Sequence, residues 1–230
     1  MTDAAAVAGV TITALVCVGS IGGLVTLVVL LVHYGRKRRQ QRIDANHAWA
    51  GHHGFHYWTS EPSALELSAH APFTSGHARV ALDVFRGTHR GRHLHFFQLQ
   101  YRTGNGEDES THDHQVVAVS LPASRPYLEV THETARSRRR ARDLQFENRA
   151  FNDLYFIESA SPRFAHDVIH PRTMEWMLAD PRARVNRWRF EGAWLLTFRS
   201  GPLRLEEVFA HADFLHQILD QVPDHVWSEP

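Results

Sequence analysis

The sequence predicts an α+β protein, in which an N-terminal transmembrane helix precedes one antiparallel-sheet domain with late helices and a C-terminal helix that packs on the sheet. Three observations predict this class. Ala4 to Gly35 contain no charged side chain. The middle of the chain alternates apolar and polar residues between Gly and Pro signals, which is typical of strands. The last element, from Leu203, repeats apolar residues at helical spacing.

The uncharged N-terminal run predicts a membrane anchor. It is 32 residues long, whereas a helix needs about 20 apolar residues to cross a bilayer core. Backbone polar groups in hydrocarbon must be satisfied internally, so residues 1–35 are expected to hold a transmembrane helix. Gly19 and Gly23 form a small-xxx-small pair through which two such helices could dimerise. Glycine is also simply frequent in membrane helices, so the pair has a second explanation.

A basic cluster follows the uncharged run and predicts its orientation. Short basic flanks stay on the cytoplasmic side of a membrane. We therefore expect a single-pass protein of the cell membrane, with its N-terminus outside and its globular domain in the cytoplasm. Residues 36–53 are expected to form a basic juxtamembrane stalk that ends near Gly51 and Gly54. The cluster consists of Arg36, Lys37, Arg38, Arg39 and Arg42.

Residues 54–230 are long enough for one globular domain. A short helix is expected at 61–68, a turn at 88–91 in which Gly91 takes positive φ, and a polar loop around Gly104 and Gly106. The element order is similar to that of pleckstrin-homology-like barrels, by analogy alone. Strands are predicted at 54–58, 79–85, 93–101, 115–121, 127–131, 143–147, 154–158, 186–191 and 193–199, the last two forming a hairpin across Gly192.

Three helices are predicted in the second half of the domain. Pro162 stands in the first turn of a helix that runs to Ile169, and Pro171 restarts a helix that runs to Leu178. The third helix carries an apolar stripe that predicts packing on the sheet. The stripe consists of Leu205, Val208, Phe209, Ala212, Leu215 and Leu219.

Charge and cysteine content exclude some classes of function. Outside Asp3 and the basic cluster, acidic residues exceed basic residues by four, so the domain is not expected to bind nucleic acid specifically. The single cysteine, Cys17, lies in the uncharged run. The globular domain therefore has no thiol nucleophile and no disulfide.

A second basic cluster lies between the predicted strands. One interpretation is contact with anionic lipid head groups at the inner leaflet, at about 1 kcal/mol per well-placed basic residue. The other is an exposed, solvated loop in an arginine-rich chain. The cluster consists of Arg136, Arg138, Arg139, Arg140 and Arg142.

Histidine is abundant, at 18 residues of 230. The pairs His93 with His95 and His112 with His114 have metal-ligand spacing, and neighbouring strands could bring them together. A zinc site needs three or four convergent ligands, and the chain has no HExxH motif. The alternative is that these histidines are solvated or packed in the core.

Three segments carry a resemblance to a known family: Val84–Gly91, Gln145–Ile157 and Ser161–Met177. They resemble an uncharacterised bacterial family, often actinobacterial, of membrane proteins that carry a domain of unknown function. The resemblance covers residues 54–227 and implies no catalytic or binding residue, because no activity is established for that family.

No enzyme signature stands out, since a G-x-S-x-G elbow and a P-loop are both missing from the sequence. No cofactor is predicted. We expect a membrane-tethered, non-catalytic interaction or sensory domain that binds a protein or lipid partner at the bilayer. The alternative is a histidine-based metal-binding protein or metal-dependent enzyme.

Overall fold

The computed structural model describes residues 2–133 and 144–228, and of their side chains all except those of residues 2–26 and 28. The chain divides into two compact units, one up to Trp49 and one from Ala50 onward.

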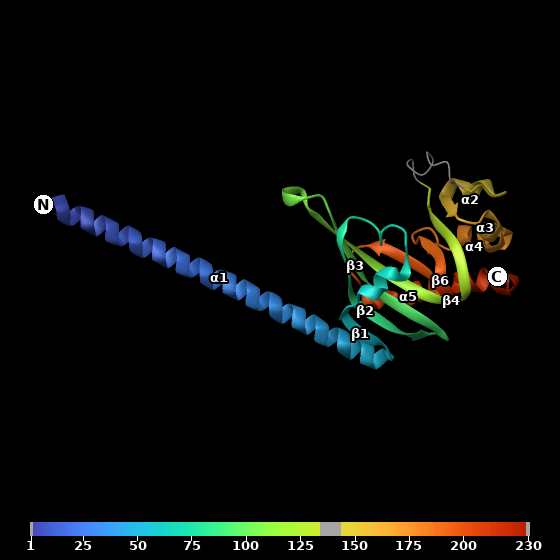
Figure 1. Cartoon of the computed structure of the whole chain (residues 1–230), viewed down its shortest axis with the longest axis horizontal. Coiled ribbons are helices and arrows are strands. Elements are labelled where there is room, and N and C mark those ends of the chain that lie inside the picture. The colour runs from blue at the N-terminus through green and yellow to red at the C-terminus, as the bar shows by residue number, and fades with distance from the viewer. Residues whose placement is uncertain (1, 134–143, 229–230) are drawn as a thin grey trace. The chain divides into compact units, whose positions relative to one another are not determined.

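The first unit belongs to helix α1 (Thr2–His53), which runs without a break through the predicted stalk and ends before Gly54 (Figure 1). Gly54 has a φ of +73°, as is common for the residue that ends a helix. Across the described residues, no helix reaches the length and apolar character of a membrane span. Most of the predicted span, including Gly19 and Gly23, lies outside the residues whose side chains are described.

The second unit is built on one antiparallel sheet of six strands (Figure 1). The pairing order runs from β1 to β5 in sequence, and β6 pairs with β4. In the described residues no pairing joins β1 to β5 or β6, so the sheet is open and differs from the barrel suggested by analogy. The strands are β1 (His56–Ser60), β2 (His77–His89), β3 (Arg92–Thr103), β4 (Ser110–His132), β5 (Tyr155–Ser159) and β6 (Trp188–Ser200).

The hairpin of β2 and β3 confirms the predicted turn. Arg90 and Gly91 have φ values of +49° and +79°, and His89 pairs with Arg92. Two central residues with positive φ make the tight turn whose twist matches that of the flanking strands. The following loop contains the short helix η2 (Gly106–Asp108).

Two predicted strand breaks are wrong, because tertiary pairing carries the strands through them. The segments 115–121 and 127–131 belong to one strand, β4, and the predicted hairpin across Gly192 is one strand, β6. The two strands pair along their length, with register shifts on either side of the pair Arg125 and Gly192. Such irregularities accommodate Pro122 and Pro126, which cannot donate ladder hydrogen bonds.

The predicted strand at 143–147 is also wrong in its described part. Residues 144–148 form a loop whose Leu144 amide donates to the Ile157 carbonyl at 3.0 Å. The unpredicted helix α2 (Arg149–Leu154) follows, and the Asn148 side chain caps it by accepting from the Phe151 amide. The predicted helices at 162–169 and 171–178 are confirmed as α3 (Pro162–Val168) and α4 (Pro171–Ala179).

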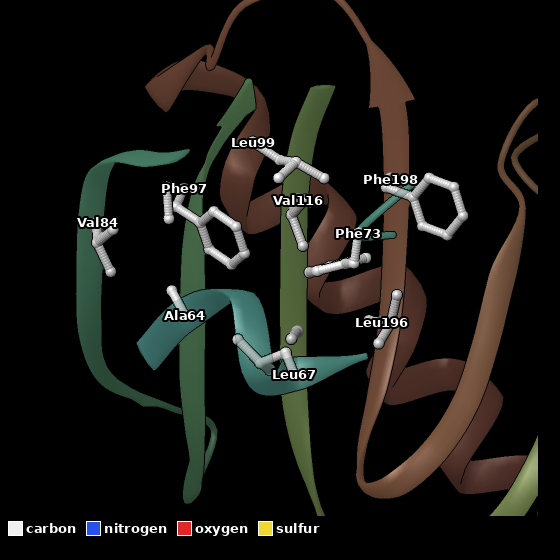
Figure 2. Close-up of a cluster of buried hydrophobic side chains, with 11 residues drawn as sticks. Ala64, Leu67, Phe73, Val84, Phe97, Leu99, Val116, Leu196 and Phe198 are labelled. Atoms are coloured by element: carbon white, nitrogen blue, oxygen red, sulfur yellow. The ribbon is translucent and has the colours of Figure 1, made fainter. Parts of the chain in front are cut away.

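Helices cover both faces of the sheet. On one face, helix η1 (Pro62–Leu67) directs Ala64 and Leu67 onto Phe97 and Val116 of the central strands (Figure 2). On the other face lies α5 (Leu205–Gln221), which contacts β4 and β6. Four stripe residues of α5 are buried as predicted. The last described element is α6 (His225–Ser228). The buried residues of α5 are Val208, His211, Ala212, Phe214, Leu215, His216, Ile218 and Leu219.

Candidate functional site

A pocket of about 610 Å³ lies on the η1 face of the sheet. It brings together segments that are far apart in the chain: the loop after η1, the ends of β3 to β6, and the segment that precedes β6. We call it the sheet pocket. It is lined by Ala71, Pro72, Ser75, Tyr101, His114, Glu129, Thr131, His132, Phe156, Val185, Arg187, Phe198, Arg199 and Ser200.

Aromatic side chains give the sheet pocket part of its wall. Phe156 and Phe198 are buried, so their positions are fixed by packing in the domain core. The Tyr101 ring stacks on His114, with ring centres 5.6 Å apart and planes at 7°. The pocket can therefore hold an apolar group as well as a polar one.

Arg187 supplies a positive charge at this pocket. Its guanidinium carbon lies 5.0 Å from the centre of the Phe198 ring, an arrangement in which the ring face attracts the cation. The Thr197 hydroxyl donates to the Arg187 carbonyl at 2.6 Å, which fixes the backbone at the start of β6. Among the residues that the structure describes, no carboxylate lies within ion-pair distance of Arg187.

Two histidines of β4 respond to this charge. Burial lowers the pKa of His114, and Arg187 and His112 lower it further, while Asp113 opposes them. Burial also lowers the pKa of His132, and Arg187 again adds to the effect. Since Arg187 acts on both rings, the three groups share one electrostatic environment although the histidines are 18 positions apart in β4.

Each of these rings has an enclosed nitrogen without a hydrogen-bond partner. The enclosed nitrogen is Nδ1 in His114 and Nε2 in His132. A neutral imidazole carries one donor and one acceptor nitrogen. An enclosed N–H without a partner is costly, so the favoured tautomer carries its proton on the other nitrogen. In the described part of the chain, that second nitrogen of each ring has no protein partner either.

The acidic residue of the pocket is already paired. Glu129 accepts a hydrogen bond from Arg189 at 2.8 Å and from the Tyr127 hydroxyl at 3.0 Å. Arg189 also donates to the Ser68 hydroxyl at 2.7 Å and to the Ala71 carbonyl at 2.6 Å, so it ties the loop after η1 to the sheet. With Glu129 neutralised in this way, the charge of Arg187 dominates the pocket.

The structure does not bring the predicted histidine pairs together. His114 pairs with Leu99, and His95 pairs with Ala118, so the two histidines are about 13 Å apart along the strands at 3.3 Å per residue. His95 packs on Trp194 at 4.4 Å between ring centres, and His112 shares a hydrogen bond of 2.7 Å with Thr103. The His93 amide donates to Ser120. Across the described ranges, no three His, Cys, Asp or Glu residues converge as a metal site would require.

Neither predicted basic cluster is among the described residues that line this pocket. Residues 36–42 are exposed on α1. The second cluster, Arg136, Arg138, Arg139, Arg140 and Arg142, lies outside the described residues.

Sequence reasoning missed the role of Arg187, Arg189 and His132. A signal for the arginines existed, because Arg187, Arg189 and Glu191 alternate with the aromatic residues Trp188 and Phe190. That pattern places charges on one face of a strand and rings on the other. It does not show which charge is buried, since that depends on the loop after η1.

Comparisons with known proteins bear on the fold. No family model matches the chain, and no curated protein matches it. Among solved structures, the crystal structure of the mycobacterial trehalose monomycolate transport factor A, TtfA, is similar, with a TM-score of 0.51 and 14% sequence identity. The similarity covers 77% of this chain and 94% of that chain. At this identity the similarity establishes a shared fold alone.

Proposed function

We propose that the protein is a single-pass membrane protein whose globular domain acts in the cytoplasm as a non-catalytic accessory factor in a transport process. The domain would bind a component of that process rather than transform it.

The N-terminal helix carries this proposal. The described part of α1 exposes Leu27, Val29, Leu30, Leu31 and Val32. A contiguous exposed apolar surface on a helix requires cover by a partner or by lipid. The basic cluster at 36–42 begins a few residues later, which is the charge arrangement of the cytoplasmic end of a membrane helix.

Fold similarity supports the transport component. The similar structure is described as a transport factor for trehalose monomycolate. Since fold alone does not imply function, the similarity motivates this part of the proposal and does not carry it.

The chemistry of the sheet pocket favours binding over catalysis. Its lining holds cations, ring nitrogens and aromatic walls, which suit recognition. Among the described residues, none of the lining hydroxyls of Ser75, Thr131 and Ser200 is hydrogen-bonded to a histidine. Such a contact is the usual sign of an activated nucleophile.

A topology experiment tests the proposal. A fluorescent reporter that matures only in the cytoplasm, fused after residue 230, should be active. A phosphatase that requires the periplasm should be inactive at the same point, and activity there would overturn the proposed topology. Replacing Arg36, Lys37, Arg38, Arg39 and Arg42 with Gln should give mixed orientation. The same loss of charge at exposed arginines of the globular domain is the control and should leave the orientation as it is.

A further inference from the structure

We propose that the sheet pocket binds a phosphate group, with Arg187 as the cation that recognises it and His114 and His132 as neutral donors beside it. This deepens the proposed function by naming the chemical class that the domain binds. It does not depend on the membrane topology.

The first argument is charge. Arg187 has no acidic partner among the described residues, while the pocket's glutamate is held by Arg189. The other lining arginine, Arg199, pairs with Glu207 at 3.2 Å. A guanidinium that faces a pocket without a counter-ion favours an anion, and its planar set of N–H donors matches the oxygens of a phosphate.

The second argument is hydrogen bonding. The enclosed nitrogens of His114 and His132 favour the tautomers that place an N–H on the remaining nitrogen of each ring. Those two donors and the guanidinium require acceptors, and a phosphate supplies three acceptor oxygens. A carboxylate has fewer oxygens to offer, so it is expected to bind less tightly.

The third argument is size. A pocket of about 610 Å³ falls within the roughly 300–1,000 Å³ of small-molecule sites and exceeds the needs of an inorganic ion. The buried rings of Phe156 and Phe198 would contact an organic group esterified to the phosphate. Both a phospholipid head group and a free phosphate ester have this chemistry.

Calorimetric titration of the full-length protein in a neutral detergent tests the proposal. The probes are inorganic phosphate, glycerol 3-phosphate, dihexanoyl phosphatidic acid, acetate and dihexanoyl glycerol. The three phosphate compounds should bind, acetate should bind at least about tenfold more weakly, and dihexanoyl glycerol should give no heat. Tighter binding of the phosphatidic acid than of glycerol 3-phosphate would assign the source as lipid, and the reverse order a free ester. Absence of phosphate binding at 10 mM, or equal binding of acetate, would overturn the proposal.

Variants locate the binding. Arg187→Gln should weaken phosphate binding by about tenfold or more, the size of a lost charge-assisted contact. Arg172→Gln removes the same charge from an exposed position on α4 and should change affinity less than about twofold. Arg187→Lys keeps the charge and should retain part of the affinity for phosphate. That result would show that Arg187→Gln binds weakly because a recognition contact is lost and not because the protein misfolds. If both Gln variants bind phosphate as the native chain does, the pocket is not the site.

A spectroscopic measurement provides an independent check. Phosphate offsets the charge of Arg187, so the pKa values of His114 and His132, measured by NMR of the rings, should rise on binding. The other charged groups at these rings are His112 and Asp113, beside His114, and Glu129 and Arg199 in the pocket lining. Phosphate that leaves both ring titrations unchanged binds elsewhere. Neither this result nor the calorimetry changes if the reporter fusions contradict the membrane topology.

Discussion

At the scale of single residues, Arg189 determines how the loop after η1 meets the sheet. Its side chain is 1% exposed and contacts Glu129 and Glu191 as well as two acceptors of the loop. A buried charge that keeps several partners is tolerated, and removing it takes the cation away from two largely buried carboxylates, those of Glu129 and Glu191.

Replacing Arg189 with Met is therefore expected to lower the free energy of unfolding by about 3–5 kcal/mol. Arg199→Met is the matched control, because the Arg199 side chain is 50% exposed in its pair with Glu207. Its loss should cost at most about 1 kcal/mol. Urea denaturation followed by tryptophan fluorescence measures both changes. Equal effects of the two substitutions would contradict the structural role of Arg189.

A second residue-scale prediction concerns acid. Burial, with help from Arg86 and His93, lowers the pKa of His95 to about 4, whereas an unfolded histidine titrates near 6.5. Between these values the unfolded chain binds the extra proton, so stability is fully present above pH 6.5 and is lost as the pH falls towards 4. The neutral His95 ring contributes roughly 2 kcal/mol to the free energy of unfolding, a value reduced for solvent screening because the ring is partly exposed.

Stability measured by urea denaturation from pH 7.5 to 4 should show this loss, and His95→Gln should flatten the curve. Burial also lowers the pKa values of His114, His132, His211 and His216, so part of the slope will remain in the variant. The same substitution at His225, whose side chain is exposed, is the control. If the free energy of unfolding of His95→Gln falls with pH as steeply as that of the native chain, His95 does not contribute to the loss of stability in acid.

At the scale of elements, the contact between β2 and the chain after α1 depends on Gly87. A Cβ at Gly87 would lie 2.5 Å from the ring of Phe55. That ring packs against Phe96 at 5.3 Å between centres. The space that Gly87 leaves is thus filled by an aromatic side chain of the core.

Gly87→Ala is expected to destabilise the domain by about 1–3 kcal/mol, because Phe55 has to move. Gly51→Ala is the control, and we expect it to change the free energy of unfolding in the opposite direction. Nothing lies within 4 Å of a Cβ at that helical position. It should stabilise the helix by up to about 1 kcal/mol. Thermal unfolding of the two variants measures the contrast. A neutral Gly87→Ala would mean that the Phe55 ring adapts without cost.

At the scale of the whole molecule, the proposed anchor would hold the domain beside an anionic surface, where its exposed charges would act at high local concentration. The arginine-rich segment 136–142 has no structural description, and its contact with lipid stays a prediction from sequence.

Fragment 43–230 should sediment with anionic vesicles at low salt and dissociate as ionic strength rises. Replacing Arg138, Arg139 and Arg140 with Ser should weaken this binding at least tenfold, at about 1 kcal/mol per residue. The control replaces Arg149, Arg172 and Arg184, which are exposed elsewhere, and should have a smaller effect. Equal losses would indicate that net charge alone governs binding.

Local patterns in the sequence were enough to predict the α+β class, both Pro-initiated helices, the turn at Gly91 and the apolar stripe of α5. These features depend on the steric limits of Pro and Gly and on the periodicity of residues that contact one another along a few turns or pairs. The same reasoning predicted breaks in β4 and β6 that do not exist. Whether a strand continues past a proline depends on the strand that pairs with it, and that pairing is not local.

The sheet pocket was decided by tertiary structure. The loop after η1, the two histidines of β4 and Arg187 come from three separate parts of the chain, and no spacing in the sequence shows that they meet. Likewise, the alternating pattern from Arg187 to Glu191 predicts that Arg187 and Arg189 lie on the same face of an extended segment. The loop after η1 covers Arg189, whereas Arg187 stays exposed. The sequence by itself determined which residues carry charge, and the packing of a distant loop decided which charge is neutralised and which remains available to a ligand.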